Sequence, residues 1–293
     1  MDKINAAMLV EPLKAPSGRQ FTRCTRIFNN GSLTAGGRLY GSWQSYNEDE
    51  RLTMTIGGEP VCEIDIKASY LSIANAKSGS GKKLAPDPYR MIRFVKDENY
   101  NQERMRSAAK SLVNVYLSKE GEITKFPVGK KTDKRTGKTI PFKEQYGLRH
   151  DVNFYMGQIH EAFPFLRESK QSDYSLMHVE SEIVVGAMLD LLVQGVVSYP
   201  VHDCLMVKVS DKEAAVKALQ KSMKHHLDYI PTMDVSWFAE DGVKHQEIEE
   251  GNGQEQKSDY FQPTEIWPEE DDDFEVIEMP VTSSTITTDP ILY

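Results

Sequence analysis

The chain has 293 residues, of which 39% are hydrophobic, and a formal net charge of −9 at pH 7. This apolar content is enough to bury one core, and it excludes a chain that is disordered throughout. Because no run of about twenty apolar residues is present and the N-terminus lacks a secretory signal, we expect a cytoplasmic protein, in the host cytoplasm if it is viral, with no membrane partner.

Acidic residues are concentrated at the C-terminal end. Residues 240–293 hold sixteen of the 44 Asp and Glu residues but only two of the 35 Lys and Arg residues, so residues 1–239 carry a net charge of about +5. A basic body favours a polyanionic partner, and a polar, acidic tail favours disorder. We predict an N-terminal basic loop region (1–51), a core (52–240) and a disordered acidic tail (241–293).

The N-terminal region combines basic and aromatic residues. Its richness in Gly, Asn, Ser and Arg over residues 17–51 predicts irregular backbone with positive charge. Such a mixture suits phosphate contact and base stacking on single strands. The residues concerned are Arg19, Arg23, Arg26 and Arg38, with Phe21, Phe28, Tyr40, Trp43 and Tyr46.

A predicted hairpin ends close to an aspartate. Apolar residues alternate through LTMTI (52–56), GGEP (57–60) predicts a turn, and VCEIDI (61–66) predicts the second strand. Asp65 lies near the exit of that strand. The next segment, ASYLSIANAK (68–77), has helical periodicity.

A basic helix and a basic loop follow. Residues 98–120 predict a helix with Arg106, Lys110 and Asn114 on one face, because residues four apart lie on the same side of a helix. On one face, the arginine guanidinium can donate two parallel hydrogen bonds to a triphosphate, and the lysine ammonium adds a compact positive charge. The segment 125–143 predicts an exposed loop, either merely solvated or tracking a nucleic-acid backbone. Its densest basic residues are Lys130, Lys131, Lys134 and Arg135.

A second predicted hairpin carries His202 and Asp203 at its tip. The predicted elements in this part of the chain are a helix at 175–195, short apolar strands at 196–201 and 204–209, and a helix at 211–227. Both strands are apolar up to the His-Asp pair, so the pair lies in a tight turn between them.

Asp65 and Asp203 are the candidate metal ligands. Each lies at the end of an apolar strand, and the two meet if those strands are neighbours in one sheet. Carboxylate oxygens are preferred ligands of Mg²⁺, and two such ions activate a hydroxyl group and stabilise a leaving pyrophosphate. Taken alone, either aspartate is more often an ordinary turn residue than a metal ligand.

Four short segments carry a family resemblance: TAGGR (34–38), EIDIKASYLSIA (63–74), RSAAKSLVNVY (106–116) and PVHDCLMVK (200–208). The last three resemble motifs A, B and C of family A DNA polymerases and of bacteriophage-type single-subunit RNA polymerases, in the order found there. The first resembles the T-x-x-G-R element of the RNA polymerases. The resemblance implies a reduced right-hand polymerase: an α+β fold with an antiparallel palm sheet and small helical fingers.

The resemblance also implies roles for the matched residues. Asp65 and Asp203, with the Ile66 carbonyl, would bind two Mg²⁺ ions, for which Mn²⁺ is a possible substitute. Lys110 and His202 would complete the catalytic centre, with His202 beside the primer terminus. The implied nucleotide contacts are Arg106, Lys110, Tyr70, Asn114, Tyr116 and His178. The implied nucleic-acid contacts are Arg38, Gly37, Arg26, Lys130, Lys131 and Arg135.

The sequence leaves the product open between RNA and DNA. The T-x-x-G-R element and Cys204, where family A DNA polymerases have glutamate, favour ribonucleotides. Tyr70, five residues after Asp65, resembles instead the steric gate of DNA-synthesising polymerases, or simply packs at the start of a helix. We expect a small DNA-directed RNA polymerase or primase-like enzyme, with a family A DNA polymerase gated by Tyr70 as the alternative.

The chain departs from the family pattern in two ways. No Tyr-Gly pair follows Asn114 within the predicted helix at 98–120, so Tyr116 is only a candidate for the sugar-sensing tyrosine. The intervals between motifs are short, which implies trimmed fingers. Expected partners are a nucleic-acid template, a primer or nascent product, nucleoside triphosphates, and an accessory polymerase subunit or single-strand-binding protein. A non-catalytic nucleic-acid-binding subunit is a third hypothesis, and a bacteriophage or mobile-element origin follows from the analogy alone.

Overall fold

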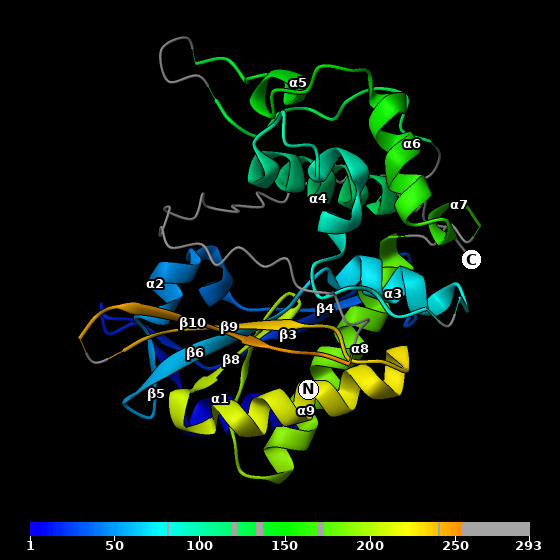
Figure 1. The fold of residues 1–293 in the computed structure, drawn as a ribbon. Coiled ribbons are helices and arrows are strands. Elements are labelled where there is room, and N and C mark those ends of the chain that lie inside the picture. The colour runs from blue at the N-terminus through cyan, green and yellow to red at the C-terminus, as the bar shows by residue number, and fades with distance from the viewer. Residues whose placement is uncertain (81, 119–121, 133–136, 169–172, 240, 253–293) are drawn as a thin grey trace, which may run out of the picture. The chain divides into compact units, whose positions relative to one another are not determined.

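The fold is α+β, with helices packed on an antiparallel sheet (Figure 1). The computed structural model describes residues 1–252 with the exception of 81, 119–121, 133–136, 169–172 and 240. These described residues belong to one compact unit. Most of the predicted acidic tail, from residue 253 onward, lies outside them. Of the helices described, none has the length and apolar character needed to cross a membrane.

The elements have the following bounds. The α-helices are α1 (Asp2–Val10), α2 (Glu48–Leu52), α3 (Ser69–Lys77), α4 (Gln102–Ser118), α5 (Phe142–Gln145), α6 (Val152–Ala162), α7 (Phe165–Glu168), α8 (Asp173–Val193) and α9 (Lys212–Leu227). The strands are β1 (Leu13–Lys14), β2 (Gln20–Phe21), β3 (Thr25–Phe28), β4 (Gly36–Tyr40), β5 (Thr55–Ile56), β6 (Glu59–Ile66), β7 (Tyr199–Val201), β8 (Cys204–Lys208), β9 (Met233–Phe238) and β10 (Lys244–Glu249). Short 3₁₀ helices are η1 (Ser42–Ser45), η2 (Pro88–Met91), η3 (Arg93–Val95) and η4 (Val209–Asp211).

Strand β6 is the centre of the sheet. Strands β8 and β9 pair with it on either side, β7 lies beyond β8 and β10 beyond β9, and all these pairs are antiparallel. Successive side chains of a strand point to opposite faces. Cys62, Ile64 and Ile66 are almost fully buried, whereas Asp65 is exposed. Helices α8 and α9 cover one face of the sheet in Figure 1, and α4 lies on the other side.

The hairpin of β7 and β8 has a two-residue turn, His202-Asp203, because Val201 pairs with Cys204. His202 has φ of +54°, a left-handed conformation that residues other than glycine seldom adopt. The preceding strand is anchored from η1, since Trp43 Nε1 donates a hydrogen bond to the Pro200 carbonyl at 3.0 Å. This anchoring holds the turn, with Asp203 in it, at one end of the sheet.

The T-x-x-G-R segment forms part of a hairpin on α8. Strands β3 and β4 pair with an irregularity at Ile27/Phe28. Arg26 Nε donates to the Gly37 carbonyl at 2.8 Å, and Arg26 Nη2 donates to Ser181 Oγ on α8 at 3.1 Å. The predicted irregular region at residues 17–51 therefore contains β2, β3, β4, η1 and α2. Its glycines signalled a loop, but here they allow a bulged hairpin to pack closely.

The four predicted helices are present, and both predicted hairpins form with shorter first strands than predicted. The strand predicted at 52–56 is reduced to β5 (Thr55–Ile56), because Leu52 ends α2, and the strand predicted at 196–201 is reduced to β7 (Tyr199–Val201). The turn of the first hairpin is shorter than predicted, because Ile56 pairs with Glu59 across Gly57-Gly58. The predicted start of the tail at residue 241 is wrong, since β10 (Lys244–Glu249) pairs along its whole length with β9. Its residues are charged and mostly exposed. A polar composition of this kind suits the edge strand of a sheet as well as it suits a disordered tail.

We predict that Gly37→Ala destabilises the protein more than Gly18→Ala does. Both glycines have positive φ, +87° and +84°, which strains any other residue. A Cβ at Gly37 would also lie 3.0 Å from the Phe28 ring and 3.2 Å from the Arg26 side chain, whereas one at Gly18 would meet nothing within 4 Å. Urea unfolding should show a loss of roughly 2–3 kcal/mol for Gly37→Ala and about 1 kcal/mol for Gly18→Ala. Equal losses would contradict the close packing of the hairpin.

Candidate functional site

Three aspartates gather at one end of the central strands. Asp65 of β6 lies opposite Cys204 of β8 on one side and opposite Asp234 of β9 on the other. Side chains of directly opposed residues share a face of the sheet, with their Cβ atoms about 5 Å apart. Asp203 immediately precedes Cys204. The structure thus brings the two predicted aspartates together and adds Asp234, which the sequence analysis did not single out.

The folded protein disfavours the ionised form of the Asp65 carboxyl group. Desolvation by the surrounding protein raises the pKa of Asp65 well above its usual range, and the charge of Asp203 raises it further. The charge of Lys110 on α4 lowers this pKa, and that of Asp234 raises it. The side chain is nevertheless exposed, so solutes can reach it. An accessible carboxylate destabilised by a second one is a site where a cation is favourable.

The donor atoms of this pair fit a hard divalent ion such as Mg²⁺, which prefers carboxylate oxygens and keeps several water ligands. The fit rests on Asp65 and Asp203, whose mutual repulsion a cation relieves. In the part of the chain that the structure describes, no group of three or more His, Cys, Asp and Glu side chains is arranged to hold a metal ion. Ile66, whose carbonyl is a further predicted ligand, is buried at the end of β6.

Asp234 already has a cationic partner. Lys67 Nζ lies 2.8 Å from Asp234 Oδ1, and both side chains are partly exposed. The backbone N–H of Lys67 also donates to the Thr232 carbonyl at 3.0 Å, which joins the end of β6 to the segment before β9. Lys67 thus balances Asp234, whereas Asp65 is exposed to the charge of Asp203, which that of Lys110 opposes.

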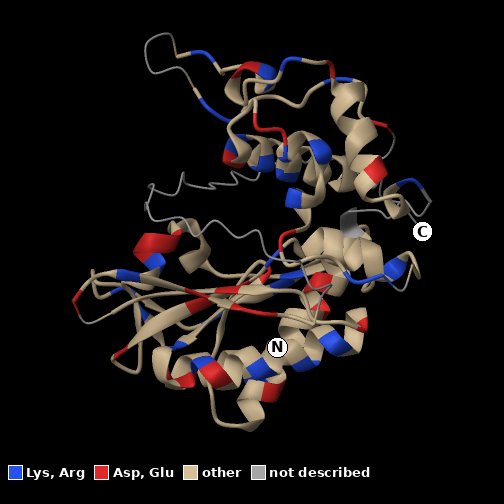
Figure 2. Cartoon of the chain, viewed as in Figure 1, with Lys and Arg blue, Asp and Glu red and all other residues tan. Residues whose placement is uncertain are grey.

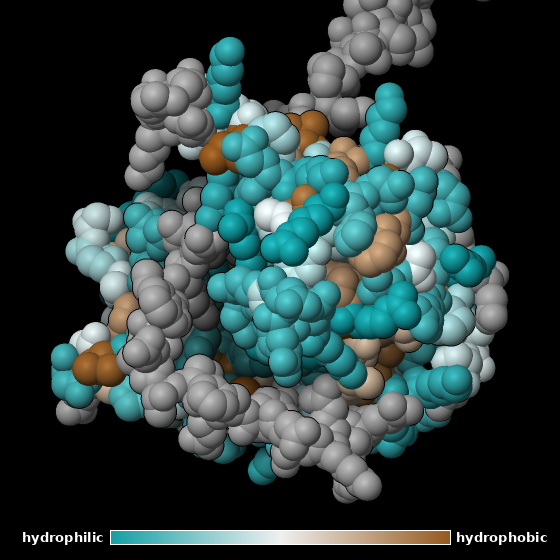
Figure 3. All heavy atoms as spheres, turned by 45° about the horizontal axis from the view of Figure 1, so that its top comes forward, coloured by the Kyte–Doolittle hydropathy of each residue, from teal (hydrophilic) through white to brown (hydrophobic). Residues whose placement is uncertain are grey.

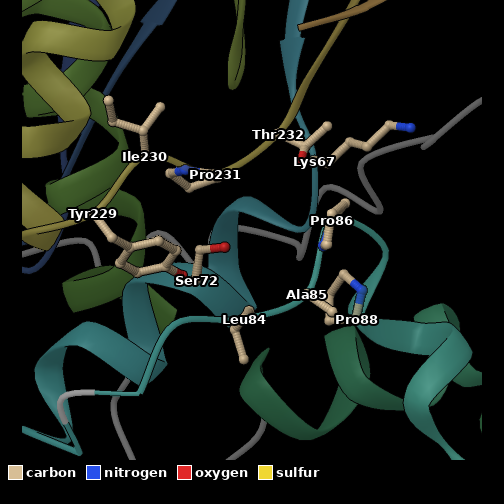
Figure 4. A pocket seen from close by; sticks show the side chains of 10 residues that line it. All are labelled: Lys67, Ser72, Leu84, Ala85, Pro86, Pro88, Tyr229, Ile230, Pro231 and Thr232. Carbon is tan, nitrogen blue, oxygen red and sulfur yellow. The ribbon is translucent and has the colours of Figure 1, made fainter. Parts of the chain in front are cut away.

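A small pocket lies beside Lys67 (Figure 4). Its walls come from α3, from residues 84–88 and from residues 229–232, and they combine polar side chains with prolines and aliphatic residues. The Tyr229 hydroxyl points toward Ser72 of α3 (Figure 4). None of the three aspartates lines this pocket.

Arg38 is held by a buried glutamate. Its Nε donates to Glu180 Oε1 at 2.8 Å, and its Nη2 lies 2.7 Å from the same oxygen. Ser69 Oγ donates to Glu180 Oε2 at 3.4 Å, and the Arg38 guanidinium lies 5.5 Å from the centre of the Tyr70 ring. Burial raises the pKa of Glu180 to about 7; the charge of Arg38 opposes this shift, and the charge of Asp203 adds to it.

His202 is half-buried beside this cluster. Burial lowers the pKa of His202, the charge of Arg38 lowers it further, and Asp203 opposes both effects. Its Nδ1 atom is buried and has no hydrogen-bond partner in the described residues. A histidine with a lowered pKa is neutral at pH 7, so His202 adds no positive charge to the site.

Of the predicted face of α4, Lys110 lies at the site. Lys110 is close enough to Asp65 to lower the pKa of that carboxyl group. Arg106 Nε lies 2.6 Å from Asp87 Oδ2, which also accepts a hydrogen bond from Arg90 at 3.1 Å. Asn114 is half-buried on the same face. The arginine is thus held by an internal carboxylate, whose other oxygen is buried without a hydrogen-bond partner among the residues described.

Other predicted residues lie away from the aspartates. Tyr116 is buried, donates a hydrogen bond to the Leu166 carbonyl at 3.0 Å and packs edge-on against His160. Its placement in the core between α4 and α6 does not support a sugar-sensing role. His178 has its Nε2 atom 4.0 Å from Glu182 Oε1, and Glu182 is also paired with Arg26. Arg26 therefore braces the β3–β4 hairpin on α8.

The predicted basic loop is only partly described. Lys130 and Lys131 are exposed, and their backbone N–H groups donate to Gln145 Oε1 at 2.8 and 3.2 Å. Arg135 lies outside the described residues. Figure 2 shows Lys and Arg side by side on α4, above acidic positions on the sheet. The face seen in Figure 3 is mainly hydrophilic, with isolated hydrophobic residues.

Comparisons with known proteins do not assign the chain to a family. No protein-family model matches it, and no curated protein sequence matches it significantly. A functional proposal therefore depends on the residues and the geometry described above.

Sequence reasoning missed Glu180, Lys67 and Asp234. For Asp234 a signal was present: in MDVSWF (233–238), Met, Val and Trp alternate with Asp and Ser, which predicts a strand. An aspartate near the start of that strand resembles Asp65 near the end of its own. Glu180 had no such signal, because nothing in a helical sequence shows that one of its glutamates meets a distant arginine.

We predict that Glu180 makes stability fall as the pH rises from 5 to 8. An unfolded glutamate has a pKa of about 4.3, whereas the folded pKa is about 7. Between these values the folded state retains a proton that the unfolded state has lost, so the free energy of unfolding decreases with pH, by roughly 3 kcal/mol. Glu180→Gln should flatten this dependence in urea unfolding at pH 5 and pH 8. Identical pH dependence in both proteins would contradict the raised pKa.

Proposed function

We propose that the protein is a template-directed nucleotidyltransferase, specifically a small DNA-directed RNA polymerase or primase-like polymerase. The observation that carries the proposal is the strand register that places Asp65 beside Cys204, and hence beside Asp203, with Lys110 within electrostatic reach. Paired carboxylates beneath a cationic helix suit the transfer of a nucleotide from a triphosphate to a 3′ hydroxyl. The order of the four polymerase-like segments supports the same class.

In this proposal the sheet is the palm and α4 belongs to the fingers of a reduced right hand. Asp65 and Asp203, with the Ile66 carbonyl, are the groups that would hold two Mg²⁺ ions, or Mn²⁺ in their place. When bound, such ions lower the pKa of the attacking hydroxyl group and neutralise the leaving pyrophosphate. Lys110 supplies a fixed positive charge beside the carboxylates, so the triphosphate is drawn toward them.

The remaining groups bind and orient the substrates. Arg106 would contact the triphosphate from the position that Asp87 gives it, and the neutral His202 would lie beside the primer terminus. Arg38 would face the template–product duplex at the edge of the site. The basic charge of residues 1–239 favours a nucleic-acid template and primer or nascent product. Trimmed fingers favour an accessory polymerase subunit or a single-strand-binding protein as a further partner.

A DNA polymerase is the second candidate, and one observation favours it. The Tyr70 ring is half-buried, and the Arg38 guanidinium lies 5.5 Å from its centre. A ring held in this way at the start of α3 can exclude a 2′ hydroxyl more sharply than a mobile one. A non-catalytic binding subunit is disfavoured, because it has no need for two adjacent carboxylates that destabilise each other.

We predict Mg²⁺-dependent primer extension that is lost in Asp203→Asn. Removing one of the paired carboxylates takes away several kcal/mol of transition-state stabilisation, so the rate should fall at least about a hundredfold. Asp190→Asn is the matched control, because Asp190 lies on α8 and pairs with Lys221 on α9. Its extension rate should equal that of the wild type. Undiminished extension by Asp203→Asn would exclude the proposed centre.

Separate extension reactions with ribonucleotides and deoxyribonucleotides decide the product. Ribonucleotide addition by the wild type supports the RNA polymerase. Extension with deoxyribonucleotides alone, together with ribonucleotide addition by Tyr70→Ala, supports the DNA polymerase, because removing the ring opens room for the 2′ hydroxyl. Tyr100→Ala is the control, since Tyr100 packs under Arg149, which is not among the predicted site residues. Template binding without extension in either reaction would favour a binding subunit.

A further inference from the structure

Glu180 is a buried carboxyl group that the proposed chemistry does not use. It lies on α8, and its side chain is 1% exposed. Burying a carboxylate is costly unless it is paired and hydrogen-bonded, and well-packed apolar residues often serve stability as well. A specific task at this position would explain why the pair is there.

Glu180 fixes the orientation of Arg38. Both Nε and Nη2 of the arginine approach a single carboxylate oxygen, at 2.8 and 2.7 Å. Because the guanidinium group is planar, two contacts along one edge set the direction of the whole group. The same group lies 5.5 Å from the centre of the Tyr70 ring. Glu180 therefore fixes the position of the Arg38 guanidinium group relative to the Tyr70 ring.

Glu180 also holds the backbone next to Tyr70. Its second oxygen accepts a hydrogen bond from Ser69 Oγ at 3.4 Å, and Ser69 is the first residue of α3. The residue before it, Ala68, has φ of +51°, a conformation that persists only when the surroundings enforce it. Tyr70 is thus restrained twice by one carboxylate, through its ring partner and through the start of its helix.

This cluster borders the aspartates. The charge of Asp203 acts on both Arg38 and Glu180, so all three groups lie within electrostatic range of one another. Three separate elements, β4, α3 and α8, meet here, because Glu180 of α8 pairs with Arg38 of β4 and accepts a hydrogen bond from Ser69 of α3. Tyr70 therefore lies beside an arginine that the charge of Asp203 also reaches.

We propose that Glu180 is a positioning residue that sets the sugar selectivity of the site through Arg38 and Tyr70. The inference rests on the proposed function, and its substrates are nucleoside triphosphates that differ at the 2′ position of the sugar. Glu180 touches no substrate. It keeps the Tyr70 ring in one place, and a ring that can move distinguishes a 2′ hydroxyl from a 2′ hydrogen less sharply.

The test is the ratio of kcat/KM for matched ribonucleotides and deoxyribonucleotides in primer extension. Glu180→Gln should move this ratio toward one, by about tenfold, whichever sugar the wild type prefers. In a Tyr70→Ala background the same substitution should leave the ratio unchanged, because residues that act through one another are not additive. A residue with a merely structural role would lower both kcat/KM values equally and leave the ratio as it was.

Two further variants complete the test. Asp190→Asn is the matched control, because it removes another ion pair of α8, with Lys221, that does not involve Tyr70. Its ratio should equal that of the wild type. Ser69→Ala removes one of the two restraints and should move the ratio in the same direction as Glu180→Gln, but less. Ser69→Ala replaces Glu180→Gln as the test variant if thermal unfolding shows that Glu180→Gln is not folded.

The outcomes separate the two levels of inference. An unchanged ratio in the folded Glu180→Gln and Ser69→Ala variants, with a wild type that extends primers, overturns the role of Glu180 and leaves the proposed function intact. A shift in the Tyr70→Ala background equal to that in the wild type also overturns it, because Glu180 would then act by another route. No extension by the wild type with either nucleotide set overturns the proposed function, and this inference with it.

Discussion

The pairing of β6 with both β8 and β9 is the constraint on which the site depends. Ile64 and Ile66 must be buried on the helical side of the sheet, and the side chains of a strand alternate. A shift of one residue would move Asp65 to the face that buries Ile64 and Ile66, at a cost in desolvation of its carboxylate. The burial of apolar residues on one face thus fixes the position of the carboxylates on the other.

The carboxylates near this strand pairing differ in how far a neighbouring cation balances their charge. Asp234 is balanced by Lys67 at 2.8 Å, and Glu180 is balanced by Arg38. Asp65 and Asp203 are left to repel each other, with Lys110 as an opposing charge. Compensation of the outer carboxylates concentrates the unfavourable negative charge where a cation or the reacting groups would relieve it. This distribution favours a chemical role for the pair over a purely structural one.

Local signals predicted much of the fold. The hairpin tip at His202-Asp203 followed from two apolar strands around a polar pair, and α3 and α4 followed from helical periodicity. Where composition was the signal, the prediction was less accurate: the charged strand β10 has the composition of a tail, and the glycine-rich hairpin of β3 and β4 has that of a loop. The prediction for Tyr116 was inaccurate in the same way. Its motif suggested a substrate contact, but its side chain faces the core, where its hydroxyl group donates to the Leu166 carbonyl.

By itself, the sequence determined which aspartates end apolar strands, which helix carries Arg106 and Lys110 on one face, and where the basic and acidic parts of the chain lie. These properties depend on residues within a few positions of one another. Only the tertiary structure decided that Asp234 joins Asp65 and that Glu180 holds Arg38 beside Tyr70. Asp65 and Asp234, like Arg38 and Glu180, are more than a hundred positions apart. They meet because the packing of the whole sheet and its helices, which no local periodicity encodes, brings their elements together.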